Sequence, residues 1–321
     1  MARVARPEEP QPIVGEEPTM FQRETGDTRR QIILHYHIFK NAGTTVESIL
    51  KDNFRARFAR FDSEDYNSTI SNDTLLEFLA RHPDVVAISS HHLRLPKPVD
   101  DRFVFHDILF VRHPVARLWS IYEFYRRTDL ETDPLSAAAK TRGAQEFFQL
   151  LIDDYPFHAN NAQVNLLANA GGKLPSESDL ARAAEVISRA AAPGVAELFD
   201  ESTVVAESCV GRAFRGLDFS YVAQNVTAGP PMRLEAQLAR FQKHCGEETF
   251  NRIINLNQLD LALVEVAHEE VLRRFDLVPH HKRRLKALRS RCVARERAAS
   301  RIIIASNHPT AFASFASAGS A

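Results

Sequence analysis

The feature that most constrains the fold is a strand, a tight turn and a helix start, which follow one another between Gln31 and Leu50. An apolar, β-leaning run ends near Ile38, and apolar residues return at helical spacing after the turn Lys-Asn-Ala-Gly. The turn carries a lysine, a glycine and two adjacent hydroxyls where a helix presents unpaired N–H groups and the positive end of its dipole. The segment therefore predicts a binding site for an anion.

Length and charge limit what kind of site this is. The chain has 321 residues, of which 44% are hydrophobic, so a large core is possible in one large domain or two small ones. Its formal net charge is -1, so no overall basic field predicts nucleic-acid binding, and an anion site must be local. The cysteines Cys209, Cys245 and Cys292 lack metal-ligand spacing, and their odd number argues against a disulfide framework.

The ends of the chain differ from its middle in composition. Residues 1–29 are rich in Pro, Glu, Arg and Gln, which predicts a disordered leader, and 291–321 are expected to form the end of a basic helix and a flexible tail. The folded domain is expected over 30–290. The sequence shows neither the apolar core of a signal peptide nor a run long enough to span a bilayer, so we expect a soluble protein without stable membrane insertion.

Strands and helices alternate along the middle of the chain. The strand Asp84–Ser90 ends in two histidines, and the strand Asp107–Val111 leads through Arg-His-Pro into a helix over Val115–Arg127. A short helix at Val195–Leu198 and a strand near Thr203–Val205 are also predicted. The remaining predicted elements are helices, over residues 74–81, 143–154, 176–191, 233–245, 248–254 and 259–274. This pattern predicts an α/β class, with a P-loop-like three-layer fold, a mainly parallel central sheet, flanking helices and helical insertions.

The first turn does not match an ordinary phosphate-binding loop of nucleotide triphosphatases, which has its lysine after the second glycine. Here Lys40 precedes Gly43, the leading glycine is absent, and the next strong strand ends in Arg112 and His113 rather than in an acidic magnesium ligand. These differences disfavour an ATPase or kinase. The alternative interpretation is a capped strand-to-helix turn with a solvent-facing lysine.

A second segment, Phe110 to Arg126, combines an arginine with a hydroxyl. Arg112 ends a strand and Ser120 lies on the helix that follows, where a guanidinium and a hydroxyl could hold one phosphate together. Taken alone, this segment equally suits a strand–helix joint with a salt-bridged arginine. Two anion-binding patterns in one chain strengthen the prediction of a phosphate site.

Together the two segments resemble the sulfotransferases that use 3′-phosphoadenosine 5′-phosphosulfate (PAPS), in particular the carbohydrate O-sulfotransferase branch related to heparan sulfate 2-O-sulfotransferases. That family has a motif H-I-P-K-T-A-G-T-[ST], which reads HIFKNAGTT at 37–45, and a later motif V-R-[DH]-P-x-x-R-x-x-S-x-Y, which reads VRHPVARLWSIY at 111–122. Phe39 and Asn41 depart from the usual proline and threonine, but the lysine and the backbone donors are kept. The resemblance extends from residue 30 to about 275.

The resemblance implies a role for each matching residue. Lys40 would bind the donor and stabilise the charge that builds on the leaving phosphate, while Arg112 and Ser120 would select the 3′-phosphate that distinguishes PAPS from ATP. The other implied donor contacts come from backbone N–H groups and hydroxyls of the loop; they belong to Asn41, Ala42, Gly43, Thr44 and Thr45. Fixed donors would replace magnesium, so no metal is implied. The implied acceptor is a sugar hydroxyl of a carbohydrate or glycoconjugate.

Sulfate transfer also needs a base for the acceptor hydroxyl, and histidine suits that task near neutral pH. His91 and His92 follow a predicted strand at the chain position where the related enzymes carry their catalytic histidine, and His92 is slightly preferred. The alternative is that both are structural or exposed loop residues. His35 is predicted to be structural, whereas His37 could line the pocket.

The leading prediction is therefore a PAPS-dependent O-sulfotransferase. The Golgi members of the resembling family carry an N-terminal membrane anchor, which this sequence lacks, so we expect a cytoplasmic enzyme. The alternative is a phosphate-loop nucleotide-binding or phosphotransfer protein without sulfotransferase activity, which would prefer ATP. No nucleic-acid partner is expected, because the basic run over 271–297 reads as a solvated helix face. The sequence leaves the acceptor, the oligomeric state and the role of this basic helix open.

Overall fold

A five-stranded parallel sheet forms the centre of the part of the chain that the structure, a computed structural model, describes. The described residues are 28–65, 68–128, 133–169, 173–224 and 232–307. The strand order is β2-β3-β1-β4-β5. The strands are β1 (Arg30–Tyr36), β2 (Phe58–Arg60), β3 (Ala87–Ser90), β4 (Phe103–Val111) and β5 (Ala192–Val195). Most of the predicted leader and the predicted tail from residue 308 lie outside the described residues.

The central strand β1 has parallel neighbours on both sides. Its residue His35 pairs with Ser89 of β3 and with Ile108 of β4. The chain leaves β1 toward the β2 edge of the sheet, and it leaves β4 toward the β5 edge. The carboxyl ends of β1 and β4 therefore form the topological switch point, where open α/β sheets place their ligands.

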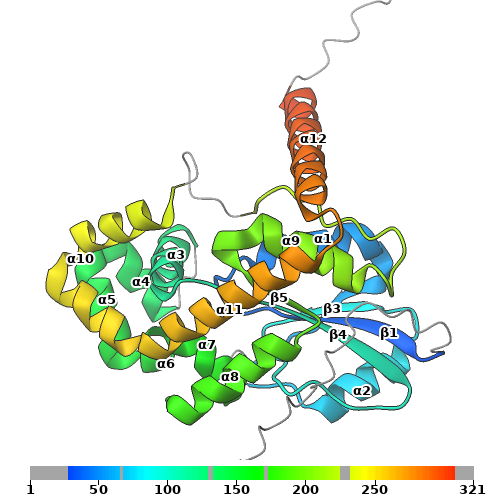
Figure 1. The fold of residues 1–321 in the computed structure, drawn as a ribbon. Helices are drawn as coiled ribbons and strands as arrows, with labels where there is room; N and C mark the ends of the chain where they lie inside the picture. Colours follow the sequence, from blue (N-terminus) through cyan, green and yellow to red (C-terminus); the bar gives the residue numbers. More distant parts are fainter. Residues whose placement is uncertain (1–27, 66–67, 129–132, 170–172, 225–231, 308–321) are drawn as a thin grey trace, which may run out of the picture.

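Helices cover both faces of the sheet, which gives three layers (Figure 1). One face carries α1 (Gly43–Phe54) and α9 (Phe199–Val210). The helices that share the other face are α2 (Asn72–Arg81), α7 (Ala162–Ala168), α8 (Glu177–Arg189) and α11 (Gln258–Leu277). The predicted α/β class, with a parallel central sheet and flanking helices, is confirmed.

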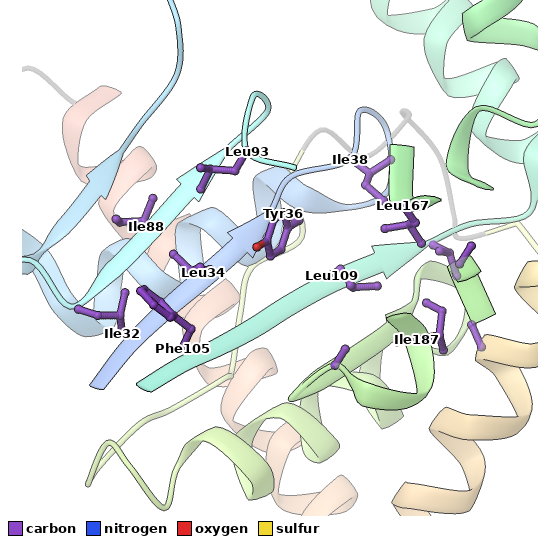
Figure 2. Packing of buried hydrophobic residues seen from close by; sticks show 14 of the residues in the cluster. Ile32, Leu34, Tyr36, Ile38, Ile88, Leu93, Phe105, Leu109, Leu167 and Ile187 are labelled. Carbon is purple, nitrogen blue, oxygen red and sulfur yellow. The ribbon is translucent and has the colours of Figure 1, made fainter. Parts of the chain in front are cut away.

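The alternation of side chains along β1 explains why this segment is so apolar. Ile32, Leu34 and Tyr36 lie in one core cluster with residues from α2, α8 and α11. Figure 2 shows Ile32 near Phe105 and Tyr36 near Leu109, both residues of β4. Ile33 belongs to the opposite cluster, which contains residues of α1 and α9. Because successive residues of a strand point to opposite faces, a strand covered on both faces needs apolar residues at nearly every position.

A group of helices packs beside the sheet as a second body of core, at the left of Figure 1. Its members are α3 (Pro114–Arg127), α4 (Pro134–Thr141), α5 (Ala144–Asp154) and α10 (Leu234–Leu256). The aromatic residues Phe147, Phe148 and Phe241 are fully buried there. The helix α10 bends at Gly246, where φ is 78°, and this bend falls between the two helices that the sequence predicts at 233–245 and 248–254.

Short helices and one long helix complete the fold. The short ones are η1 (Arg55–Arg57), α6 (Pro156–Ala159) and η2 (Ala196–Leu198). The long helix α12 (His281–Asn307) begins against α9 and then projects away from the rest of the molecule (Figure 1). Throughout the ranges given above, no helix combines the length and the apolar character needed to cross a membrane.

The strand predicted near Thr203–Val205 is wrong, because these residues form a buried turn of α9. β-branched residues favour strands on a half-buried sheet. Here, however, the segment is buried between the sheet and later helices, and this packing makes it helical. The sequence pattern also does not predict β5, whose proline and glycine are unusual for a strand. Gly194 is needed there because a Cβ would lie 2.5 Å from the ring of Phe110.

Candidate functional site

The loop between β1 and α1 has a backbone that few residues with a side chain adopt. Lys40 has φ of 66° and Ala42 has φ of 62°, both in the left-handed region. Ala42 is the N-cap of α1, and no side chain of the described residues caps this helix end. Left-handed residues in turns help to form the backbone concavities that bind anions, and strained residues of this kind gather at functional sites.

The start of α1 presents hydrogen-bond donors that the fold leaves unused. The N–H groups of Ala42, Gly43 and Thr44 have no acceptor among the residues that the structure describes, whereas the N–H of Thr45 donates to the Ala42 carbonyl at 3.0 Å. The first turn contains no acidic residue. Three free donors and the positive end of the helix dipole therefore meet at one point without an internal anion.

The side chain of Lys40 is a partly buried cation without an acidic partner in the described part of the chain. Its Nζ lies 4.7 Å from the centre of the Phe124 ring and 5.6 Å from that of Phe39. Burial, together with the positive charges of Arg112 and Arg127, lowers the pKa of Lys40 to about 8. A cation in such surroundings favours an incoming anion, which would restore its charged form.

Arg112 connects the second predicted segment to the first. Its Nη1 donates to the carbonyl of Lys40 at 3.1 Å, across the switch point between β4 and β1. Its Nε lies 4.0 Å from Oε1 of Glu197, and the same oxygen accepts the N–H of His113 at 3.1 Å. Burial raises the pKa of Glu197 against the opposing charge of Arg112. The structure therefore brings the lysine and the arginine of the two motifs together.

Ser120 is placed less directly. It lies on the second turn of α3, is partly buried, and its hydroxyl has no hydrogen-bond partner among the described residues. Among the described residues, no hydrogen bond or ion pair joins Ser120 to Arg112. The motif's other arginine, Arg117, holds the loop instead, because it donates to the carbonyls of Phe39 at 3.2 Å and His158 at 3.0 Å.

Asn41 braces the loop from the inside. Its side chain is fully buried, and its Nδ2 donates to the carbonyl of Phe110 at 2.9 Å and to Oε1 of Gln163 at 2.8 Å. The amide of Gln163 in turn accepts the N–H of Arg112 and donates to its carbonyl, both at 2.8 Å. The N–H of Asn41 donates to Ile38 at 3.2 Å. Of the predicted donor-binding residues, Asn41 thus has its donors engaged within the protein.

The other loop residues occupy different environments. Thr44 is exposed, whereas Thr45 is buried and its Oγ1 accepts the N–H of Gln224 at 3.2 Å. A Cβ on Gly43 would lie 2.0 Å from Cδ2 of His37. Glycine is therefore required where the imidazole of His37 packs beneath the start of α1.

His91 lies next to the loop through His37. The two ring centres are 3.8 Å apart, and the ring of His37 itself contacts the position of Gly43. The N–H of His91 donates to Oδ1 of Asp62 at 2.7 Å, which fixes its backbone. Burial, and then the charge of His37, lower the pKa of His91 to about 4, so the ring is neutral at pH 7. A neutral, partly exposed imidazole can accept a proton.

The ring of His92 has different neighbours from the ring of His91. It is 5% exposed, and its Nδ1 lies 3.1 Å from Oδ1 of Asp62 and 3.3 Å from the backbone nitrogen of Ser63. The sequence slightly prefers His92 as the base, but the geometry favours His91, because His92 is buried against the loop that follows β2. The predicted structural role of His35 agrees with its burial and its 2.9 Å hydrogen bond to Ser89.

Sequence reasoning does not find several residues of this site. Glu47 lies on the inward face of α1. An acid among the apolar positions of a predicted helix is the sequence signal that indicates such a buried charge. Arg127 carries no pattern of its own, because its role depends on contacts between distant segments. Asp62 is one of several acids in a polar loop, and the pairing of β2 with β3 is what brings this acid to the two histidines.

Comparison with known proteins adds a relative but no activity. No protein-family model matches the chain. The chain is similar to an uncharacterized protein of Archaeoglobus fulgidus, with 28% identity over 241 residues that make up 74% of this chain and 95% of that protein. The fold and the site thus define an α/β protein with an anion-receptive strand–loop–helix at the switch point of its sheet.

Proposed function

We propose that this protein is a sulfotransferase that moves the sulfuryl group of PAPS to a hydroxyl of a carbohydrate or glycoconjugate. The observation that carries the proposal is the contact between the two anion-binding segments, in which Arg112 donates to the carbonyl of Lys40 beside the free N–H groups of α1. Both segments match sulfotransferase motifs in order and spacing. The carboxyl ends of β1 and β4 are also where an open α/β sheet binds a nucleotide.

The donor side of the reaction uses groups that are fixed before the donor arrives. The bond between sulfur and the bridging oxygen breaks, and its electron pair stays on the phosphate of the product, 3′-phosphoadenosine 5′-phosphate. Lys40 and the N–H groups of Ala42, Gly43 and Thr44 would stabilise that charge. Preorganised donors at the place where charge develops are the largest single contribution to many enzymatic rates.

The acceptor side requires one proton to leave the hydroxyl as its oxygen bonds to sulfur. His91 is our choice for the base, because it is neutral at pH 7 and lies beside the loop through His37. Asp62 holds the backbone of His91 through its N–H and approaches the ring of His92. His92 would then support the loop rather than accept the proton.

Specificity for PAPS depends on the 3′-phosphate. Arg112 and Ser120 are the residues that the motif offers for it, and the hydroxyl of Ser120 has no partner in the described chain. The free N–H groups and Lys40 would equally hold a phosphate of another nucleotide. A phosphate-loop nucleotide-binding or phosphotransfer protein is therefore the alternative function, and it differs in needing ATP rather than a 3′-phosphorylated donor.

Transfer of labelled sulfate tests the proposal. The purified protein is incubated with labelled PAPS and a panel of glycans and glycolipids, and each product is examined for the added mass of one sulfuryl group. We expect a sulfated product without added metal, and far slower formation of that product with Lys40→Ala. Transfer of phosphate from ATP with magnesium, and none of sulfate from PAPS, would favour the alternative function.

A further inference from the structure

Three imidazole rings stack at the carboxyl ends of β1 and β3. The ring centres of His35 and His37 are 5.2 Å apart, and those of His37 and His91 are 3.8 Å apart. His35 and His37 are buried, whereas His91 is partly exposed. The stack thus runs from the interior of the sheet toward the proposed base, and His37 is its middle member.

One buried acid touches the middle ring. Oε2 of Glu47 lies 3.4 Å from Nδ1 of His37, and the carboxylate is held from its other side by Arg60, whose Nε donates to Oε1 at 3.1 Å. Glu47 comes from α1 and Arg60 from β2, so the contact joins two elements that flank β3. Burial opposes ionisation of Glu47, but the contact with His37 and the hydrogen bonds from Arg60 outweigh it and lower its pKa to about 2. The carboxylate is therefore charged across the physiological range.

The other groups around the stack do not touch the middle ring in this way. Asp62 accepts the backbone N–H of His91 at 2.7 Å and approaches His92, and Arg94 donates to the carbonyl of His91 at 2.6 Å. Two protonated rings at the spacing of His37 and His91 would repel each other strongly. The negative charge of Glu47 by itself raises the pKa of His91, but burial and the charge of His37 outweigh it.

We propose that Glu47 is a positioning residue, which holds the ring of His37 and through it keeps the ring of His91 in place. The assignment of His91 as the base rests on the proposed function, but the effect of Glu47 on the stack does not. A surface salt bridge would be the simpler explanation for Glu47 and Arg60, since Arg60 is exposed and such pairs contribute little. The burial of Glu47 and its contact with His37 argue for a role directed inward.

Nuclear magnetic resonance titration of the ring signals of His37 and His91 tests the inference without an acceptor. In Glu47→Gln, the stack should take up its first proton at lower pH than in the unchanged protein, because the attracting negative charge is gone. Arg60→Gln removes a positive charge beside Glu47 and leaves the carboxylate in place, so the stack should take up its first proton at higher pH; this variant provides the test if Glu47→Gln does not fold.

Kinetics provides the second measurement. Glu47→Gln should lower kcat by about tenfold to a hundredfold, the loss typical when a supporting contact of a reactive group is removed, while the dissociation constant of 3′-phosphoadenosine 5′-phosphate stays unchanged. The matched control is Glu77→Gln, because Glu77 is an exposed acid of α2 that approaches only Arg81 at 3.6 Å among the described ion pairs. It should change neither quantity.

The outcomes separate this inference from the proposed function. If the ring titrations of His37 and His91 are the same in Glu47→Gln and in the unchanged protein, Glu47 is a structural salt-bridge partner and the inference is wrong. If those titrations change as expected but no acceptor is ever sulfated, the stack is as inferred and the proposed function fails. A fall in kcat without any change in ring titration would also overturn the inference.

Discussion

At the scale of single residues, the site is defined by one partly buried cation, Lys40. Lys40 has no acidic neighbour in the described chain, is partly buried, and lies near the charges of Arg112 and Arg127. Such an arrangement stabilises the fold less than a paired lysine would, because burial disfavours the charged amine. Proteins keep such costly groups where a ligand supplies the missing charge.

Replacement of Lys40 tests this interpretation. Lys40→Ala should lower kcat by about 10²- to 10³-fold at saturating PAPS, the loss typical of a missing transition-state donor. The matched control is Lys51→Ala, because Lys51 is exposed in the last turn of α1, the helix that follows the loop of Lys40. Steady-state kinetics of both variants provides the measurement. Near-normal turnover by Lys40→Ala would remove this residue from the reacting centre.

The pH dependence of donor binding follows from the same residue. The amine of Lys40 attracts phosphate only when protonated, and its pKa in the free protein is about 8. The affinity for 3′-phosphoadenosine 5′-phosphate should therefore be constant below that pH and fall above it. In Lys40→Arg the charge persists at high pH, so the fall should disappear. Calorimetric titration from pH 6 to 10, with both proteins, would show whether it does.

The choice between the two histidines is a further prediction at this scale. His91→Ala should lower kcat by about 10²- to 10⁴-fold, as loss of a positioned base does, with nucleotide affinity unchanged. His92→Ala should chiefly lower the melting temperature, because it removes a buried partner of Asp62. In the unchanged protein, kcat/KM should decline only as the pH falls toward about 4, since His91 is neutral above that value. A large loss of kcat in His92→Ala, with only a lower melting temperature in His91→Ala, would assign the base to His92.

At the scale of elements, the loop depends on helix α1 packing directly over β1. The contact between Gly43 and His37 leaves no room for a side chain, and the amide of Asn41 ties the loop to β4. The free N–H groups thus owe their positions to buried contacts rather than to the loop itself.

Gly43→Ala tests that packing. A Cβ 2.0 Å from the His37 ring must displace either the ring or the loop, so unfolding should become easier by about 1–3 kcal/mol, and nucleotide affinity should fall. Gly143→Ala is the control, because the N-cap of α5 has nothing within 4 Å of its Cβ position. Adding His37→Ala to Gly43→Ala should recover part of the stability. Equal melting temperatures for Gly43→Ala and Gly143→Ala would contradict the contact.

At the scale of the whole molecule, the sequence predicts the layers better than the site. Apolar runs such as Gln31 to Ile38 identify strands buried on both faces, and the structure confirms the parallel sheet. The error at Thr203–Val205 arises because burial on several sides, which no local pattern reveals, overrides β propensity. For the site, spacing identifies Lys40 and Arg112, but Glu47 acquires its role only when α1 places it against His37.

We propose above all that the site recognises a nucleotide with a 3′-phosphate and that it needs no metal. The most direct measurement compares the binding of 3′-phosphoadenosine 5′-phosphate and adenosine 5′-phosphate, which differ in that one phosphate, in the presence of a chelator. We predict much tighter binding of the first, with a gain of about 2.7 kcal/mol in the free energy of unfolding at a hundredfold excess over its dissociation constant. Arg112→Ala should remove most of the difference. Equal binding of the two nucleotides, or stabilisation seen only with ATP and magnesium, would contradict the claim.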